Sequence, residues 1–143
     1  MELVVKKFDE LNIHELYEIL RVRQEVFVVE QECAYLDADG VDQDAIHVFL
    51  RDETGIKAYL RVFERDERTA QIGRMLTTQR GGGFGGALLK EGIRIAKGML
   101  NKEAVYIEAQ TYAIGFYARE GFRVVSEEFL EDGIPHVKMI LEF

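Results

Sequence analysis

The sequence predicts a mixed α/β domain of the α+β type, in which a twisted, mostly antiparallel sheet is flanked by helices. The length of 143 residues suits a single domain over residues 1–143. Hydrophobic residues make up 48% of the chain and charged residues 31%, a balance typical of a folded core rather than of disorder. The order of the periodic segments is the third observation, because it indicates a β-meander followed by β-α-β and α-β-β units.

The first half of the chain predicts a strand, a helix and three further strands. The first strand is expected over residues 2–8. Asn12 and Glu15 then have the spacing of a capping box, and apolar residues follow a helical period to about Glu30. Residues 31–44 predict an acidic loop. The three strands of an antiparallel meander, joined by short polar turns, are expected at residues 45–51, 56–64 and 69–76.

A glycine-rich loop over residues 79–86 separates the meander from the second half of the chain. A helix is expected over residues 87–100, a strand over residues 104–110 and a short helix over residues 112–120, which Gly121 ends. The last two strands are expected at residues 122–126 and 136–141.

The composition excludes several classes of protein. With 26 acidic against 18 basic residues the net charge is -8, which disfavours binding to nucleic acid or to an anionic membrane surface. The single cysteine, Cys33, cannot form a disulfide within the chain. No secretory leader or apolar membrane span is present in the sequence, so we expect a cytoplasmic protein. The acidic run Asp37–Asp42 lacks the spacing of a calcium loop, and no metal is expected.

The charge is unevenly distributed along the chain. Residues 24–50 carry seven acids and no Lys or Arg, and residues 127–132 carry four more acids. Residues 74–123 instead carry eight bases and four acids. We interpret this as two surfaces of opposite sign. The cationic surface would bind an anionic ligand, and the acidic surface would lie at the entrance of a site for a cationic ligand.

The glycine-rich loop predicts an anion site. The run Arg80-Gly-Gly-Gly-Phe-Gly-Gly86 follows a strand and precedes a helix, so free amides and the positive end of the helix dipole meet there. A nucleotide P-loop is excluded because Ala87 and Leu88 stand where Lys and Ser or Thr are needed. A dinucleotide fingerprint is formally present, but only 57 residues follow Gly86, too few for a doubly wound sheet.

Two motifs resemble those of the GNAT acetyltransferase superfamily. The loop Arg80–Gly85 resembles the signature Arg/Gln-x-x-Gly-x-Gly/Ala, and Gly115–Phe122 resembles the motif F-Y-x-x-x-G-F. Further segments resemble the ElaA-like branch of that superfamily. These are residues 23–31 with Cys33, residues 39–42 with His47, and residues 129–137.

The resemblance implies a GNAT fold that uses acetyl-CoA as co-substrate, without a metal, to acetylate a primary amine of a small molecule or peptide. It implies that the backbone of Met75, Leu76 and Thr77 pairs with the pantetheine arm. Loop amides would hold the pyrophosphate, with Phe84 as a wedge between helix and sheet. The loop residues are Arg80, Gly81, Gly82, Gly83, Phe84 and Gly85. Many members of the superfamily dimerise, so a homodimer is one expected state.

The resemblance also assigns candidate catalytic residues. Tyr117 matches a tyrosine that protonates the leaving thiolate, a role that suits a phenol because it keeps its proton at neutral pH; packing in the core is the alternative. The attacking amine must be neutral, so a base must take its proton. By residue type alone the candidates are Glu25, Glu30, Asp39, Glu108 and Asp132. Glu108 is preferred if its side chain faces the cleft, and an exposed strand carboxylate is the alternative. Glu30, His47 and His136 are candidates for binding the acceptor. Either histidine could also act as the base, and a structural hydrogen bond is the alternative for both.

Two other classes of function stay open at this point. A non-catalytic acyl-CoA-binding module would keep the glycine loop without depending on Tyr117, and a nucleotide-dependent oxidoreductase would use the same loop for a dinucleotide. The sequence does not identify the acceptor.

Overall fold

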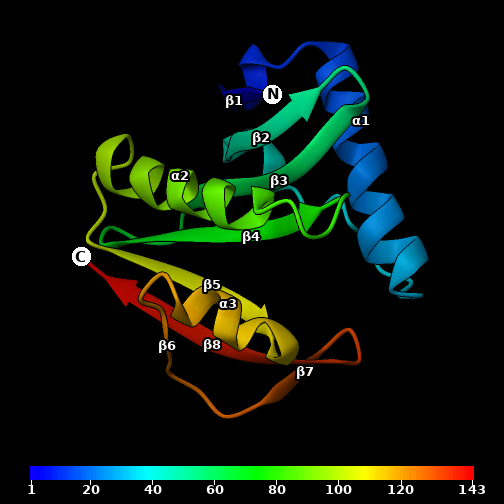
Figure 1. The fold of residues 1–143 in the computed structure, drawn as a ribbon. Helices are drawn as coiled ribbons and strands as arrows, with labels where there is room; N and C mark the ends of the chain where they lie inside the picture. The colour runs from blue at the N-terminus through cyan, green and yellow to red at the C-terminus, as the bar shows by residue number, and fades with distance from the viewer.

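The computed structural model describes residues 1–143 and contains one eight-stranded sheet with helices on both faces (Figure 1). The strands are β1 (Glu2–Lys7), β2 (Ile46–Asp52), β3 (Gly55–Glu64), β4 (Thr69–Thr77), β5 (Ala104–Gln110), β6 (Arg123–Val124), β7 (Phe129–Glu131) and β8 (Ile134–Glu142). The α-helices are α1 (Ile13–Arg23), α2 (Phe84–Gly98) and α3 (Ile114–Ala118). No helix is long and apolar enough to span a membrane.

The order of strands is β1-β2-β3-β4-β5-β8-β6, and β7 pairs with β8. All pairs are antiparallel except β4 with β5, which run parallel because α2 crosses from one to the other. The predicted mixed, mostly antiparallel sheet flanked by helices is therefore confirmed.

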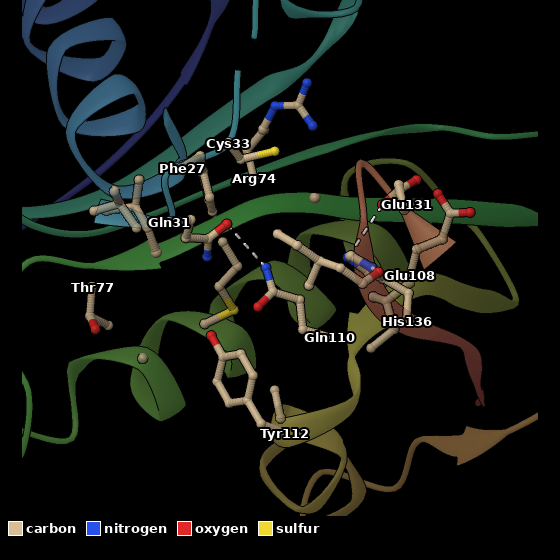
Figure 2. A pocket seen from close by; sticks show the side chains of 18 of the residues that line it. Phe27, Gln31, Cys33, Arg74, Thr77, Glu108, Gln110, Tyr112, Glu131 and His136 are labelled. Atoms are coloured by element: carbon tan, nitrogen blue, oxygen red, sulfur yellow. Dashed lines mark hydrogen bonds and ion pairs between the residues drawn. The ribbon is translucent and has the colours of Figure 1, made fainter. Parts of the chain in front are cut away.

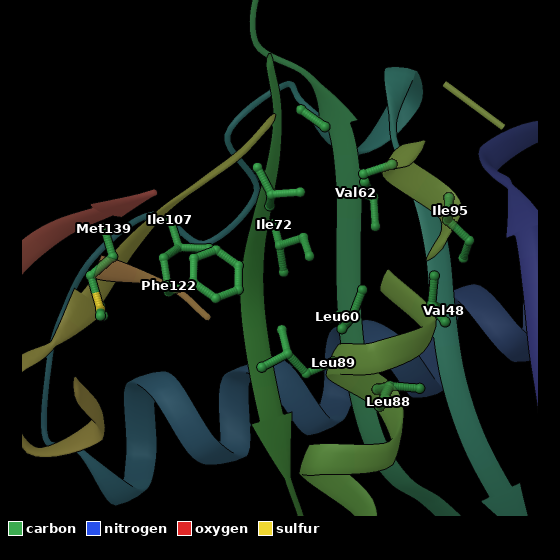
Figure 3. Close-up of a cluster of buried hydrophobic side chains, with 14 of the residues drawn as sticks. Val48, Leu60, Val62, Ile72, Leu88, Leu89, Ile95, Ile107, Phe122 and Met139 are labelled. Atoms are coloured by element: carbon green, nitrogen blue, oxygen red, sulfur yellow. The ribbon is translucent and has the colours of Figure 1, made fainter. Parts of the chain in front are cut away.

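Alternation along β3 divides the apolar core between the two faces of the sheet. Leu60 and Val62 face α2 and belong to the larger cluster, in which Leu88 and Leu89 of α2 also lie (Figure 3). Tyr59 faces α1 and packs with the smaller cluster. Gly92 lets α2 approach the sheet closely, because a Cβ there would lie 3.0 Å from Ile72 Cδ1 and 3.1 Å from Leu60 Cδ2.

The capping box before α1 forms as predicted. The Glu15 amide donates to Asn12 Oδ1 at 2.8 Å and the Asn12 amide donates to Glu15 Oε1 at 3.0 Å. The helix continues to Glu30 as expected, but after Arg23 it widens into a π-helical segment, residues Gln24–Glu30. Such segments are rare and occur frequently at functional sites.

Three local predictions need correction. The helix after the glycine loop begins at Phe84 rather than at residue 87, because Gly83 caps it in the left-handed conformation with φ of 71°. The strand expected over residues 122–126 covers only Arg123–Val124. Strand β7 was not predicted, although the Asp132-Gly133 pair, with φ values of 51° and 78°, is a strong hairpin signal.

Candidate active site

Strands β4 and β5 pair over only three residues and then separate (Figure 1). The last pair is Gln71 with Tyr106, whereas β4 continues to Thr77 and β5 to Gln110. The backbone groups of β4 from Ile72 onward therefore have no strand partner on the side of β5. A cleft of about 870 Å³ lies at this separation, lined by residues of both strands.

A β-bulge in β4 lies beside this cleft. Tyr59 pairs with Leu76 and Arg61 with Gly73, so β4 has one residue more than β3 in this interval. Arg74 takes the left-handed conformation, with φ of 50°, which is uncommon for a residue other than glycine. The bulge bends the strand where the cleft begins, a position at which bulges often occur next to active sites.

One end of the cleft has the properties of a phosphate and amide site. The backbone N–H groups of residues 81–86 have no acceptor in the protein, and the first helical bond runs from the Ala87 amide to Gly83 O at 3.2 Å. Gly85 lies against β4, because a Cβ there would lie 3.3 Å from Thr77 Cγ2. Arg80 also lines the cleft and has no acidic partner. Free amides beside an open strand edge fit a diphosphate that carries an extended, amide-containing arm.

The residues expected to bind the cofactor divide into two groups. Met75, Leu76, Thr77, Arg80 and Gly85 line the cleft. The others lie outside its lining: Gly81, Gly82, Gly83 and Phe84. Phe84 packs on the larger core cluster, as expected of a wedge between helix and sheet. Cofactor binding by these residues stays a prediction, which the free loop amides support.

Tyr117 comes from α3 and lines the same cleft. Its half-buried ring makes edge contacts with Phe116, at 5.1 Å between ring centroids, and with Phe122, at 5.9 Å. Burial raises the pKa of Tyr117 to about 12, and the nearby Tyr112 adds to the increase. The phenol is therefore fully protonated at neutral pH and can donate to a ligand in the cleft. Tyr117 both packs against the core and lines the cleft, so packing does not exclude its predicted role as an acid.

The opposite end of the cleft holds the acid expected as base, with two further titratable groups (Figure 2). Glu108 of β5 accepts from the Tyr106 hydroxyl at 3.0 Å. His136 of β8 places Nε2 3.4 Å from Glu131 Oε2 of β7. Burial raises the pKa of Glu131, and the negative charge of Glu108 raises it further. Glu30, also a candidate, is exposed and lines the cleft from the end of the π-helical segment.

His47 is not part of the cleft, so its expected place in the acceptor site is wrong. Its side chain is completely buried; Nε2 lies 2.9 Å from Asp42 O and Nδ1 lies 2.8 Å from the Tyr59 hydroxyl. Because a carbonyl only accepts, Nε2 donates and Nδ1 accepts from Tyr59. Burial lowers the pKa of His47, which favours this neutral form. The structural alternative considered for this histidine is the one observed.

The charge count of the acidic loop predicts an acidic surface at the acceptor entrance, but most of this charge is neutralised within the protein. Arginines of α1, β3 and β4 neutralise three of its four aspartates, whereas Asp44 is exposed. Arg23 Nε donates to Asp37 Oδ2 at 2.9 Å, and Arg61 Nη2 donates to Asp39 Oδ2 at 2.6 Å. Asp42 binds two of the three arginines. The remaining arginine, Arg74, places Nε 2.9 Å from Asp37 Oδ1. We call this group of Arg23, Arg61, Arg74, Asp37, Asp39 and Asp42 the arginine–aspartate network.

Several residues of the cleft were not among the predicted site residues. Gln31 and Gln110 meet across it, with Gln110 Nε2 3.4 Å from Gln31 Oε1. Cys33 Sγ lies 3.5 Å from Asp132 O on the β7–β8 hairpin, so the loop after the π-helical segment reaches over the cleft. Glu131 and Tyr112 also line it. Only Glu131 had a local signal, the hairpin pair that follows it in the sequence.

A β4–β5 pair that separates, free amides in the glycine-rich loop and a tyrosine in the same cleft are typical of the GNAT acetyltransferase fold. Residues 14–143 match the family described as Acetyltransferase (GNAT) domain. The chain belongs to this family.

Similar proteins agree with this assignment. A UPF0039 protein of Schizosaccharomyces pombe is 38% identical over 146 residues, covering 99% of this chain and 97% of that protein. The crystal structure of an acyl-CoA N-acyltransferase from Pseudomonas aeruginosa superposes with a TM-score of 0.92 at 35% identity, and that of Escherichia coli ElaA with a TM-score of 0.92 at 33% identity; both cover 99% of each chain. The predicted family and its ElaA-like branch are confirmed.

Proposed function

We propose that this protein transfers the acetyl group of acetyl-CoA directly to the primary amine of a cationic small molecule or peptide. One observation carries the proposal: a single cleft joins the open edge of β4, and Arg80 and Gly85 of the glycine-rich loop, to Tyr117 and then to a group of carboxylates. The coarser assignment, membership of the GNAT acetyltransferase family, does not itself identify the acceptor.

The first half of the cleft suits the co-substrate. We expect the amides that follow Arg80 to bind the pyrophosphate, since six consecutive N–H groups there have no acceptor in the protein. The backbone of Met75–Thr77 is free on the β5 side and can pair with the amides of the pantetheine arm. Bound in this way, the co-substrate supplies an activated acyl group beside Tyr117, and the fixed geometry contributes much of the rate.

Tyr117 supplies a hydrogen-bond donor where negative charge develops on the sulfur. The amine nitrogen attacks the thioester carbonyl carbon, the carbon–sulfur bond breaks, and the phenol gives its proton to the departing sulfur. A phenol with a raised pKa keeps that proton until the sulfur becomes negative. The second proton of the amine nitrogen restores the phenol, so no protein group is altered at the end of the reaction.

The acceptor end favours a positively charged amine. Glu30, Glu108, Glu131 and Asp132 line this part of the cleft. Arg74, the one arginine near them in the lining, places its guanidinium against Asp37 and Asp39, so its charge is balanced. An alkylammonium is attracted to such a site and a carboxylate is repelled from it. We expect the Glu108 carboxylate to bind the substrate ammonium before the ammonium loses its proton.

Two measurements test the proposal. Coenzyme A at about 100 times its Kd should stabilise the protein by about 2.7 kcal/mol in thermal unfolding, and NAD should not. Acetyl-CoA consumption is then followed with 1,5-diaminopentane, pentylamine and 5-aminopentanoate, three primary amines of equal length that differ in charge. We expect the diamine to react fastest and the amino acid slowest.

Stabilisation by NAD but not by coenzyme A would overturn the assignment of the loop. Binding of coenzyme A without turnover of any amine would favour a non-catalytic acyl-CoA-binding module instead. A preference for the amino acid would contradict a cationic acceptor, because the carboxylates of the cleft would then have to bind an anion.

A further inference from the structure

The hairpin of β7 and β8 brings a histidine and a glutamate together inside the cleft. Phe129 pairs with His136 across the two strands, and their rings stack at 6.0 Å between centroids with an interplanar angle of 28°. Glu131 is two residues beyond Phe129, so its side chain is on the same face of the hairpin. The pairing therefore places the carboxylate diagonally beside the imidazole, at 3.4 Å.

The tautomer of His136 is fixed by its own strand. Nδ1 lies 2.7 Å from Ile134 O, and since a carbonyl only accepts, Nδ1 carries a proton. In the neutral ring the lone pair is then on Nε2, the atom that faces Glu131. His136 is only 6% exposed, so few groups other than a ligand in the cleft can reach this lone pair.

Three carboxylates line the part of the cleft that holds His136. Glu131 of β7 places Oε2 3.4 Å from Nε2, and Glu108 of β5 and Asp132 of the turn between β7 and β8 line the same cleft. Lys138, the cation two residues along β8, is exposed and does not line it. An imidazolium formed at this place is therefore next to negative charge and, through Nδ1, still bound to Ile134 O.

We propose that His136 is the group that accepts the first proton of the acceptor amine and that Glu131 is the positioning residue that stabilises the resulting imidazolium. This rests on the proposed function and deepens it, because it moves the role of base from Glu108 to His136. One N–H bond of the ammonium breaks and its proton passes to Nε2. The freed nitrogen lone pair forms the bond to the acyl carbon. His136 later releases its proton to solvent, which accounts for the one proton that acetylation of an ammonium produces.

The first test does not depend on turnover. The chain has three histidines, His14, His47 and His136, so their imidazole resonances can be assigned by substitution and titrated by NMR in the coenzyme A-bound protein. We expect nitrogen shifts that place the proton of neutral His136 on Nδ1. In Glu131→Gln the NMR titration of His136 should move to lower pH, because the carboxylate 3.4 Å from Nε2 is lost. Glu128→Gln, the same change at an exposed position outside the cleft, should leave it unchanged.

The second test uses the pH dependence of kcat/KM with the fastest amine of the panel. Wild type should lose activity as the pH falls through the pKa of His136. Glu131→Gln should move this acid limb to lower pH by the amount that NMR measures, and His136→Asn should abolish it and lower kcat/KM by about 10²-fold or more. In His136→Ala, added imidazole should restore activity at least tenfold, which loss of packing alone would not allow.

The outcomes separate the two proposals. An acid limb that persists in His136→Asn, an unmoved limb in Glu131→Gln, or no effect of imidazole on a folded His136→Ala protein would overturn the role of the pair. A His136 pKa that does not respond to Glu131→Gln would overturn it too, even if no amine reacts. Absence of turnover with every amine, with the NMR result as expected, would instead count against the proposed acetyl transfer.

Discussion

Asp42→Ala should strongly destabilise the protein, because Asp42 compensates two buried arginines. Its Oδ1 accepts from Arg23 Nη1 at 2.7 Å and from Arg61 Nη1 at 2.9 Å. The Arg23 side chain is completely buried and that of Arg61 is 4% exposed. Removing one partner of a buried ion pair costs about 3–5 kcal/mol, since the remaining charge stays desolvated. Arg23 retains Asp37 and Arg61 retains Asp39, so we expect a loss near the lower value.

Urea unfolding at neutral pH measures this loss. With a slope near 2 kcal/mol/M, a loss of about 3 kcal/mol lowers the midpoint by about 1.5 M. Asp44→Ala is the matched control, because Asp44 lies two residues away in the same turn and is exposed. It should change stability by no more than about 0.5 kcal/mol. Equal midpoints for the two variants would refute the view that the arginine–aspartate network holds the loop.

The contribution of Asp42 to the free energy of unfolding depends on pH, and the direction follows from its pKa. Burial opposes ionisation of Asp42, but the hydrogen bonds from Arg23 and Arg61 outweigh it and lower the pKa. A carboxyl whose pKa is lower in the folded state contributes stability above its unfolded pKa of about 3.9, and this contribution is lost as the pH falls through the folded pKa. The difference between wild type and Asp42→Ala should therefore narrow as the pH falls below about 3.9. A difference that widens there would contradict the assignment.

Three further predictions concern single side chains. Tyr117→Phe should lower kcat by about 10²–10⁴-fold with little change in KM for acetyl-CoA, and wild type should show no alkaline limb from Tyr117 below pH 10, because its pKa is about 12; steady-state kinetics against pH check both. Gly85→Val should weaken the stabilisation by coenzyme A in thermal unfolding, because its side chain would fill the space against β4, whereas Gly86→Ala, with nothing within 4 Å of its Cβ, should not. Gly92→Ala should lower the free energy of unfolding by about 1–3 kcal/mol through overpacking, while Gly98→Ala, in open space on the same helix, should raise it by up to about 1 kcal/mol.

Most elements of the fold could be predicted because their signals are local. The capping box at Asn12 and the alternation of Leu60 and Val62 depend on neighbours a few residues apart, and both are confirmed. The change to a π-helix after Arg23 has no such signal. Within this segment Val26 and Phe27 pack against the smaller core cluster and line the cleft, contacts with residues distant in the sequence. The β7 strand does have a local signal, because the Asp132-Gly133 pair after it is typical of a hairpin turn.

The candidate site was predictable only where one segment carries it. The glycine loop and the motif around Tyr117 are each continuous in the sequence. The groups that surround a charged side chain come instead from segments far apart in the sequence. His47 looked like a ligand-binding histidine because it follows an acidic run, yet the fold places Tyr59 and a carbonyl against its ring. Counting charges along the chain likewise missed that Asp42 meets Arg23 and Arg61, which are 19 positions away on either side.

The arginine–aspartate network changes what the two halves of the chain contribute to the cleft. It neutralises Asp37, Asp39 and Asp42, three of the five acids of the acidic loop. By fastening that loop to the bulge in β4 it holds Gln31 and Cys33 over the cleft. Three of the four carboxylates at the acceptor end come instead from β5 and the β7–β8 hairpin. The first half of the chain therefore covers the cleft, and the second half supplies both the free amides for the co-substrate and most of the charge for the acceptor. Substitutions that change acceptor preference should accordingly cluster in β5, β7 and β8, whereas substitutions in the acidic loop should act mainly through stability.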